Sequence, residues 1–439
     1  MELTTQLIER KPIERLRESI TTTPGRMRLL AVLIALSAVG AGVVTATAAT
    51  ARKHAAHAVA AQTEPLLVEA DGLYASLSDA DATAATTFLT GGIEPVARRR
   101  RYVSDLRSAT SELSTLSHQV GNDPVARAAV STVVAQLPVY SGLVETARAN
   151  NRQGFPIGAA YLRQASDLMR QTILPASGRL YALEARRLAS DYGSGVSTGT
   201  YVAVALAGAL ALAVLIVSQL YVALRTRRVF NVPMLVGSLI LLGVVVWTLV
   251  GFSAEQDALS RAQRKGSDSV EVLSATRILT LRAEGDESLA LVARGGGDQY
   301  VADFSTVNSV LGHTGGRGLL SEAAGVSRQT GSAKSFAGFV SLLARYRNVH
   351  GRIAAFENSG EFGDAIKLAV GTRAKEAPLA DRLNASLGAQ IAVAQRRFRQ
   401  AVGDATAALR GLSFGIPVVV AVAGVLALFG LFQRINEYR

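Results

Sequence analysis

The sequence predicts an all-α fold with four transmembrane helices, two extracytoplasmic helical-bundle domains and a tandem internal duplication. Three observations predict this architecture: four long apolar runs, helical spacing of the apolar residues between them, and a stretch that recurs about 205 residues later. The chain has 439 residues, of which 49% are hydrophobic and 18% are charged. Its apolar and charged parts must therefore be segregated along the chain.

The four apolar runs contain no Asp, Glu, Lys, Arg or His, and they lie at 29–50, 201–224, 229–253 and 413–432. Each has about the 20 residues that a helix needs to cross a hydrocarbon core of about 30 Å. The first run ends in small residues, as a cleaved secretory signal does, but the 28 residues before it are a long leader for such a signal. We therefore expect an uncleaved anchor.

Arginines predict which side of the membrane each segment faces, because short loops rich in Lys and Arg stay in the cytoplasm. The loop 225–228 carries Arg225, Arg227 and Arg228. The N-terminal tail 1–28 agrees with it, since it contains Arg10, Lys11, Arg15 and Arg17. We expect a multi-pass protein of the plasma membrane with the tails 1–28 and 433–439 in the cytoplasm and the segments 51–200 and 254–412 outside.

Both long segments have the periodicity of helical bundles, because their apolar residues recur at spacings of three and four. In the first segment, turn residues at 90–95, 121–124 and 153–156 delimit four helices. Glycine-rich stretches, including 295–297 and 358–363, divide the second segment in the same way. In an up-down-up-down bundle between two spans, the first and third turns lie farthest from the membrane.

The internal repeat places acidic residues at equivalent positions. "LYASLSDADATAATTFLTGG" at 73–92 matches "ILTLRAEGDESLALVARGGG" at 278–297, so that Asp79 falls on Glu284 and Asp81 on Asp286. These acids lie in mid-helix, where propensity does not favour a short acid such as Asp. They either bind a cationic ligand group or pair with arginines of the other bundle. The alternative is a solvated face, or an internal salt bridge to Arg282 or Arg107.

The distal turns are the predicted outer binding surface. Four consecutive arginines just past the first turn cannot all find acids on their own helix, so they either dock an acidic partner or form a solvated rim. The candidate residues for outer partner binding are Gly91, Gly92, Arg98, Arg99, Arg100, Arg101, Phe155, Gly296 and Phe362.

The cytoplasmic parts are too short to fold an enzyme domain. The apolar residues of the N-terminal tail have roughly helical spacing with Arg and Glu between them, which predicts an amphipathic helix on membrane lipid or on a cytosolic protein. No nucleotide-binding, kinase or zinc motif is present, and the chain has no cysteine. We expect no enzyme activity, no cofactor and no metal. The net charge of +12 is spread without a basic block interleaved with aromatics, so nucleic-acid binding is not expected.

The layout and the N-terminal stretch "LIERKPIERLRESITTTPGRMRLL" resemble the actinobacterial four-span membrane proteins of the GlnX type. The resemblance implies two partners, namely a glutamine-type solute-binding lipoprotein outside the cell and the soluble Ser/Thr protein kinase G inside. It also implies that the protein senses the amino-acid-loaded binding protein, of the glutamate, aspartate or glutamine type, and relays its state to the kinase. The inner contacts would include Arg10, Lys11, Arg15, Arg17 and the arginines of the loop 225–228.

Taken together, the sequence favours a signal-transmitting receptor. The alternatives are a membrane subunit of an amino-acid uptake system, which would require substrate flux, and a structural envelope protein, which would have no ligand-dependent partner. Association of two copies into a homodimer stays open.

Overall fold

The computed structural model describes residues 23–92, 94–121, 123–195, 198–226, 231–294, 296–370 and 379–436. Over these ranges the chain is helical and contains no strand, which confirms the all-α prediction. The tail residues Arg10, Lys11, Arg15 and Arg17 lie outside the described residues, as do Arg227 and Arg228. Arg225 belongs to the last turn of a described helix.

Contacts within the chain define two compact units. The first, here called the span unit, comprises Met1–His57, Tyr192–Leu259 and Gly403–Arg439. The second, the bundle unit, comprises Ala58–Asp191 and Ser260–Val402. The two predicted bundles therefore share one compact unit instead of standing as two separate domains.

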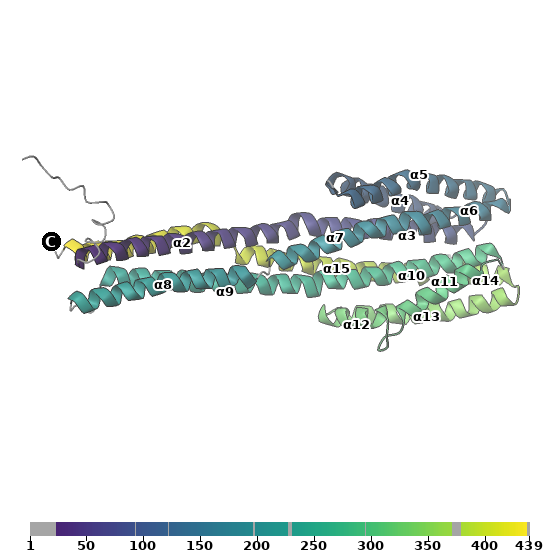
Figure 1. Cartoon of the computed structure of the whole chain (residues 1–439). Coiled ribbons are helices and arrows are strands. Elements are labelled where there is room, and N and C mark those ends of the chain that lie inside the picture. The colour runs from purple at the N-terminus through teal and green to yellow at the C-terminus, as the bar shows by residue number, and fades with distance from the viewer. Residues whose placement is uncertain are drawn as a thin grey trace, which may run out of the picture. The chain divides into compact units, whose positions relative to one another are not determined.

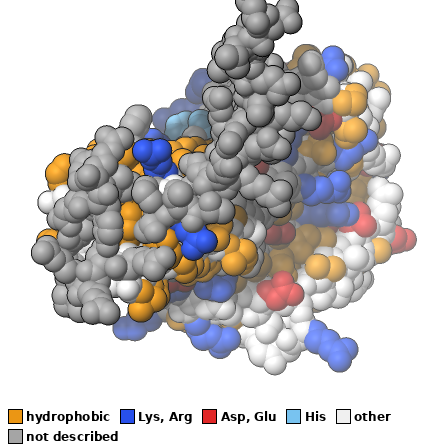
Figure 2. All heavy atoms as spheres, turned by 60° about the vertical axis from the view of Figure 1, so that its left-hand side comes forward, with side chains coloured by type: hydrophobic (Ala, Val, Ile, Leu, Met, Phe, Trp, Pro, Cys, Tyr) orange, Lys and Arg blue, Asp and Glu red, His pale blue; other side chains and the backbone are white. Residues whose placement is uncertain are grey.

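Among the described residues, the helices of the span unit include four that are long and apolar enough to cross a membrane. They belong to α2 (Thr23–Ala58), α8 (Thr198–Thr226), α9 (Val232–Ala262) and α16 (Leu412–Asn436). Side chains of all four meet in one apolar core that includes Ile34, Leu215, Leu241 and Ala427. Many other large apolar side chains stay exposed, and Figure 2 shows hydrophobic side chains spread over the surface of this part of the chain. An exposed apolar surface of this extent suits contact with lipid.

A buried ion pair joins three helices of the span unit. Arg52 of α2 donates a hydrogen bond to Glu255 of α9 and another to Thr200 of α8. Its guanidinium also lies 4.4 Å from the ring centroid of Phe252. Because a buried charge is costly unless it is paired, these contacts fix the register of the three helices at this level.

The first segment of the bundle unit folds into the four helices that the sequence predicts, with breaks at the expected turns. They are α3 (Glu64–Phe88), α4 (Val96–Gln119), α5 (Pro124–Arg152) and α6 (Ile157–Leu168), which continues through the π-turn η2 (Met169–Ile173) into α7 (Leu174–Gly195). Asp123 accepts hydrogen bonds from the backbone N–H groups of Val125 and Ala126, so it is the N-cap of α5.

The second segment is divided more finely than the first. Its helices are α10 (Asp268–Ala293), α11 (Asp298–Leu311), α12 (Leu319–Gln329), α13 (Ala333–Asn358), α14 (Phe362–Val370) and α15 (Leu379–Ala408). The glycine-rich stretch at 312–318 separates α11 from α12, since Gly312, Gly315 and Gly318 all have positive φ. Figure 1 shows α4 and α5 on one side of α3 and α10, and α12 and α13 on the other.

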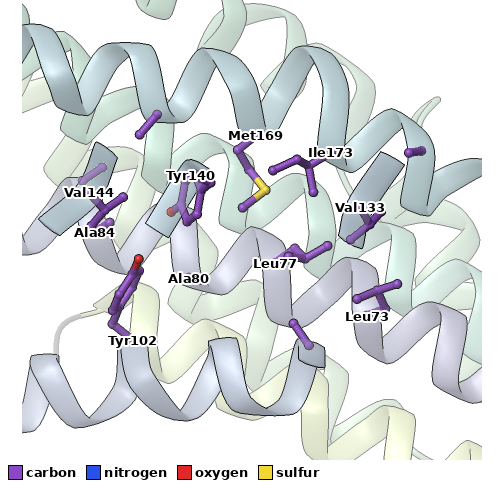
Figure 3. Close-up of a cluster of buried hydrophobic side chains, with 14 of the residues drawn as sticks. Leu73, Leu77, Ala80, Ala84, Tyr102, Val133, Tyr140, Val144, Met169 and Ile173 are labelled. Carbon is purple, nitrogen blue, oxygen red and sulfur yellow. The ribbon is translucent and has the colours of Figure 1, made fainter. Parts of the chain in front are cut away.

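Helices α3 and α10 form the centre of the bundle unit. Every residue from Leu77 to Thr87 and from Ala283 to Val292 is buried, whereas a surface helix buries only one face. Figure 3 shows Leu73, Leu77 and Ala80 of α3 among the aromatic and aliphatic side chains of α4, α5 and η2. The same apolar cluster includes Leu289 and Leu291 of α10. The core of the first segment is thus completed by the second.

The duplication is visible in the helix boundaries. Helix α3 ends at Phe88 and α10 at Ala293, which are 205 residues apart. The π-turns η1 (Val59–Thr63) and η3 (Gln263–Ser267) precede these helices at positions 204 residues apart. Side chains also pair at a nearly constant separation along the chain, since Asp71 contacts Ser274 at a separation of 203 and Thr86 contacts Ser288 at 202. The repeated helices α3 and α10 therefore run parallel and in register.

Candidate functional site

The candidate site is the buried charged seam between α3 and α10, together with the arginines that reach it from α4, η2 and α10. We use "charged seam" for Asp79, Asp81, Arg101, Arg170, Arg277, Glu284 and Asp286. The prediction of a solvated face for the repeated acids is wrong, because all four are buried. All four lie within stretches of α3 and α10 in which every residue is buried.

Asp79 is held by groups from three other helices. Arg101 of α4 donates Nη2 to Asp79 Oδ1 at 2.6 Å, and Asn384 of α15 donates Nδ2 to Oδ2 at 2.9 Å. Arg277 of α10 lies 4.0 Å from the same carboxylate. Arg101 also forms an ion pair with Asp381 of α15. The repeated acid of the first copy is thus bound to residues of the second copy.

Asp81 and Asp286 share one arginine. Ser166 donates to Asp81 Oδ1 at 2.8 Å, and Arg170 Nε lies 3.4 Å from Asp81 Oδ2. The Nη1 of the same guanidinium forms an ion pair with Asp286 of α10. Since Gly285 has no side chain, the Arg170 guanidinium has room there; a Cβ at that position would lie 2.7 Å from Nη2. Arg170 therefore links the two copies through their equivalent acids.

Burial favours the protonated form of two carboxyl groups of the seam, Glu284 and Asp286. Burial raises the pKa of Glu284 to about 8, and the nearby carboxylate of Asp381 raises it further while Arg101 opposes the shift. Burial also raises the pKa of Asp286 to about 6, although the adjacent Arg170 lowers it. On α3, burial raises the pKa of Asp71 to about 6. Desolvation outweighs the arginines at these three positions.

These contacts agree with the interpretation that the repeated acids pair with arginines of the other copy. Arg277 approaches Asp79 across the copies, Arg170 binds Asp286, and Arg101 joins Asp79 to Asp381. The proposed partner Arg282 contacts Asp303 at 3.8 Å instead. The seam is therefore a contact between the copies whose charges are largely matched.

The four arginines at 98–101 do not form one surface, contrary to the predicted docking patch or rim. Arg101 points inward to Asp79 and Asp381, and Arg99 pairs with Glu145 at 2.5 Å. Nη1 of Arg98 is buried, and only Arg100 is exposed. Four consecutive residues on a helix point in four directions, which separates them in this way.

The first and third turns of the first segment lie at the same end of the bundle unit. Asn151 donates Nδ2 to the carbonyl of Phe88 at 2.9 Å, and Arg148 forms an ion pair with Glu94. Three of the predicted binding residues at this end are exposed, namely Gly91, Gly92 and Phe155. In the second copy, Gly296 is exposed and Phe362 is partly buried at the start of α14.

Arg170, Arg277 and Asn384 were not predicted as site residues. Their contacts with the repeated acids span 89 residues or more along the chain, so no local sequence pattern could predict these contacts. The sequence does contain one indication for Arg170, because this arginine lies among apolar residues in the stretch "LMRQTIL" at 168–174. A lone arginine in such a stretch of a bundle helix needs a buried acid.

Over the described residues, no group of three or more His, Asp or Glu side chains is placed to hold a metal ion.

Residues 55–193 match the family model described as an actinobacterial sensor domain. The match covers the first copy of the duplicated unit, from the end of α2 to the end of α7, and it supports a sensing role in actinobacteria. No curated protein and no solved structure matches the chain.

Proposed function

We propose that the protein is a transmembrane receptor that senses an amino-acid-binding lipoprotein outside the cell and relays its state to a cytosolic Ser/Thr kinase. The observation that carries the sensing part is the match of the first copy to a sensor domain, in a chain with four helices apolar enough to cross a membrane. The partners follow from the resemblance of the N-terminal stretch and layout to the GlnX type.

The order of the helices supports transmission along the chain. Helix α2 is followed by η1 and α3 with no intervening loop, and α9 is followed by η3 and α10 in the same way. A shift of α3 against α10 would therefore act on backbone that continues as helix into the apolar segments. Shifts of about 1–2 Å are usual for such elements. The protein would act through binding and helix movement and would catalyse no reaction.

The binding lipoprotein is assigned to the end of the bundle unit that carries Gly91, Gly92 and Phe155. These residues are exposed, and Phe155 offers an apolar side chain of the kind that anchors protein interfaces. Among the four arginines at 98–101, Arg100 is the exposed one, so it can bind an acidic partner without breaking an ion pair inside the bundle unit. Changing Arg100→Ser should weaken binding of the lipoprotein at low salt more than at high salt. The control is Arg352→Ser, an exposed arginine on α13. Equal weakening by both changes would remove Arg100 from the contact.

The kinase is assigned to the tail 1–28 and the loop 225–228. The test replaces residues 2–24 with a Gly-Ser segment of equal length and measures the kinase response to extracellular amino acids in cells. We expect normal membrane levels of the protein and no response. The control replaces residues 437–439 with the same kind of segment. A full response from the chain with the replaced N-terminal tail would show that the kinase does not read the tail.

A further inference from the structure

The bundle unit contains a cavity of about 270 Å³ beside the charged seam. Its walls come from α3, from η2 and α7, and from α10, so both copies contribute to it. Gly178 lies in one wall, where a Cβ would come within 3.4 Å of the ring of Tyr74. Ligand pockets usually measure about 300–1,000 Å³, so this cavity suits a molecule at the small end of that range.

The polar groups of the cavity have hydrogen-bond donors in excess. Arg170 donates hydrogen bonds from Nε to Asp81 and from Nη1 to Asp286. Its Nη2 lies next to Gly285 and has no acceptor among the described side chains. Arg282 is 49% exposed and reaches Asp303 only at 3.8 Å. A guanidinium has five N–H donors and no acceptor, so both arginines retain donors for a ligand.

The carboxylate of Asp81, which lines the cavity, already accepts hydrogen bonds from protein groups. Asp81 accepts from Ser166 and Tyr140 through Oδ1 and from Arg170 through Oδ2. Tyr74 and Ser78 also line the cavity, and a hydroxyl group can donate as well as accept. An occupant that offers hydrogen-bond acceptors to the free donors of Arg170 and Arg282 therefore suits this lining.

The remaining lining is apolar and includes Leu174, Ile278 and Leu281. It suits a short hydrocarbon body, which inorganic anions lack. We propose that this cavity binds a small organic carboxylate, with its anionic group between Arg170 and Arg282 and its hydrocarbon part against these three side chains. Fork-like guanidinium groups match the two oxygens of a carboxylate.

Binding would alter the seam. A ligand carboxylate on Nη2 would share the Arg170 guanidinium with Asp81 and Asp286, and the contact with Asp81 is the long one at 3.4 Å, whereas the pair with Asp286 is close. An occupied cavity would therefore loosen the link between α3 and η2 and keep the link to α10. The site goes beyond the proposed relay, because it would give the bundle unit a ligand of its own.

The test is calorimetric titration of the purified full-length chain in lipid nanodiscs with succinate, glutarate and L-glutamate at millimolar concentration. Inorganic phosphate and the uncharged succinamide are the comparison probes. We expect at least one carboxylate to bind and succinamide not to bind. Phosphate binding as tightly as the best carboxylate would overturn the assignment to an organic ligand, and absence of binding by all three carboxylates would overturn the site.

Two variants locate the binding. Arg282→Gln should weaken it about tenfold or more, the effect of one charge-assisted hydrogen bond, whereas Arg352→Gln should leave it unchanged. Ile278→Phe fills the cavity and should abolish binding while thermal unfolding shows a folded chain. Unchanged affinity in both Arg282→Gln and Ile278→Phe would place the ligand elsewhere. The titration contains neither lipoprotein nor kinase, so a negative result here leaves the proposed relay standing.

Discussion

Arg170 is the residue on which the contact between the two copies depends most. It is 14% exposed and faces two buried carboxylates, Asp81 of the first copy and Asp286 of the second. Removing one partner of a buried ion pair is more costly than removing a surface pair, because a desolvated charge is left without compensation.

Changing Arg170→Met should destabilise the bundle unit by about 3–5 kcal/mol, the range for breaking a buried pair. The measurement is loss of helical circular dichroism on heating the purified chain. Arg352→Met is the control, since Arg352 is exposed and a surface arginine contributes about 0–1 kcal/mol. Equal unfolding temperatures for the two variants would show that Arg170 does not hold the copies together.

Glu284 should make stability depend on pH. Burial raises its pKa from 4.5 to about 8 in the folded chain, so the folded state binds the proton more tightly than the unfolded state. The stability that this group contributes is fully present below pH 4.5 and is lost as pH rises to about 8. Asp286 and Asp71, whose pKa values are raised to about 6, act in the same direction at lower pH.

The prediction is that the unfolding temperature falls between pH 5 and pH 8 and that Glu284→Gln makes this fall smaller. Gln cannot ionise, so the variant has no proton to lose over this range. The same pH dependence in both proteins would mean that another group causes it.

The repeat identified the four acids from the sequence, but their partners could not be predicted. Asp79 and Glu284 are equivalent by alignment, whereas the approach of Asn384 to Asp79 depends on how α15 packs. The run at 98–101 shows the same limit, because its charge is evident in the sequence and the inward direction of Arg101 is set by acids on α3 and α15.

Among the helices, the π-turns have local causes in two of the three cases. Pro65 follows η1 by two residues and Pro175 follows η2 by two residues. Proline has no N–H and its ring clashes with the carbonyl four residues earlier, so a wider turn relieves the clash. η3 has no such proline, and Gly266 lies within it against α15.

Gly266 should tolerate no side chain. A Cβ there would lie 2.6 Å from Phe398 Cβ and 2.8 Å from Phe398 Cα, so α15 would have to move. Gly266→Ala should destabilise the chain by about 1–3 kcal/mol through overpacking. The control is Gly388→Ala in the middle of α15, where a Cβ meets nothing within 4 Å and where alanine should stabilise the helix by about 0.5–1 kcal/mol. A higher unfolding temperature for Gly266→Ala would contradict the tight contact.

Helix boundaries were the most predictable feature of the chain. In the first segment, proline and glycine lie at each observed break between helices. Asp123 is the N-cap of α5, as its position before Pro124 predicts. The separate helices α11 and α12 were less evident, because the glycines at 312–318 mark a loop without showing how many helices it divides.

At the scale of the whole molecule, the duplication gives each of the two units, taken by itself, the arrangement of a parallel dimer. Contacts separated by 203 residues join Asp71 to Ser274 in the bundle unit, and the same separation joins Arg52 to Glu255 in the span unit. The shared core was not predictable from periodicity, which shows that a helix has an apolar face and does not show what covers it. A second chain is not needed to bury α3 or α10.

The central claim is that the bundle unit faces the outside of the cell and the loop 225–228 faces the cytosol. The chain has no cysteine, so single cysteines report on one position each. Arg100→Cys and Arg227→Cys would be treated in intact cells with a membrane-impermeant maleimide, with the unchanged chain as the blank. We predict labelling of Arg100→Cys in intact cells and of Arg227→Cys only after permeabilisation. Labelling of Arg227→Cys in intact cells, with Arg100→Cys protected, would contradict the account.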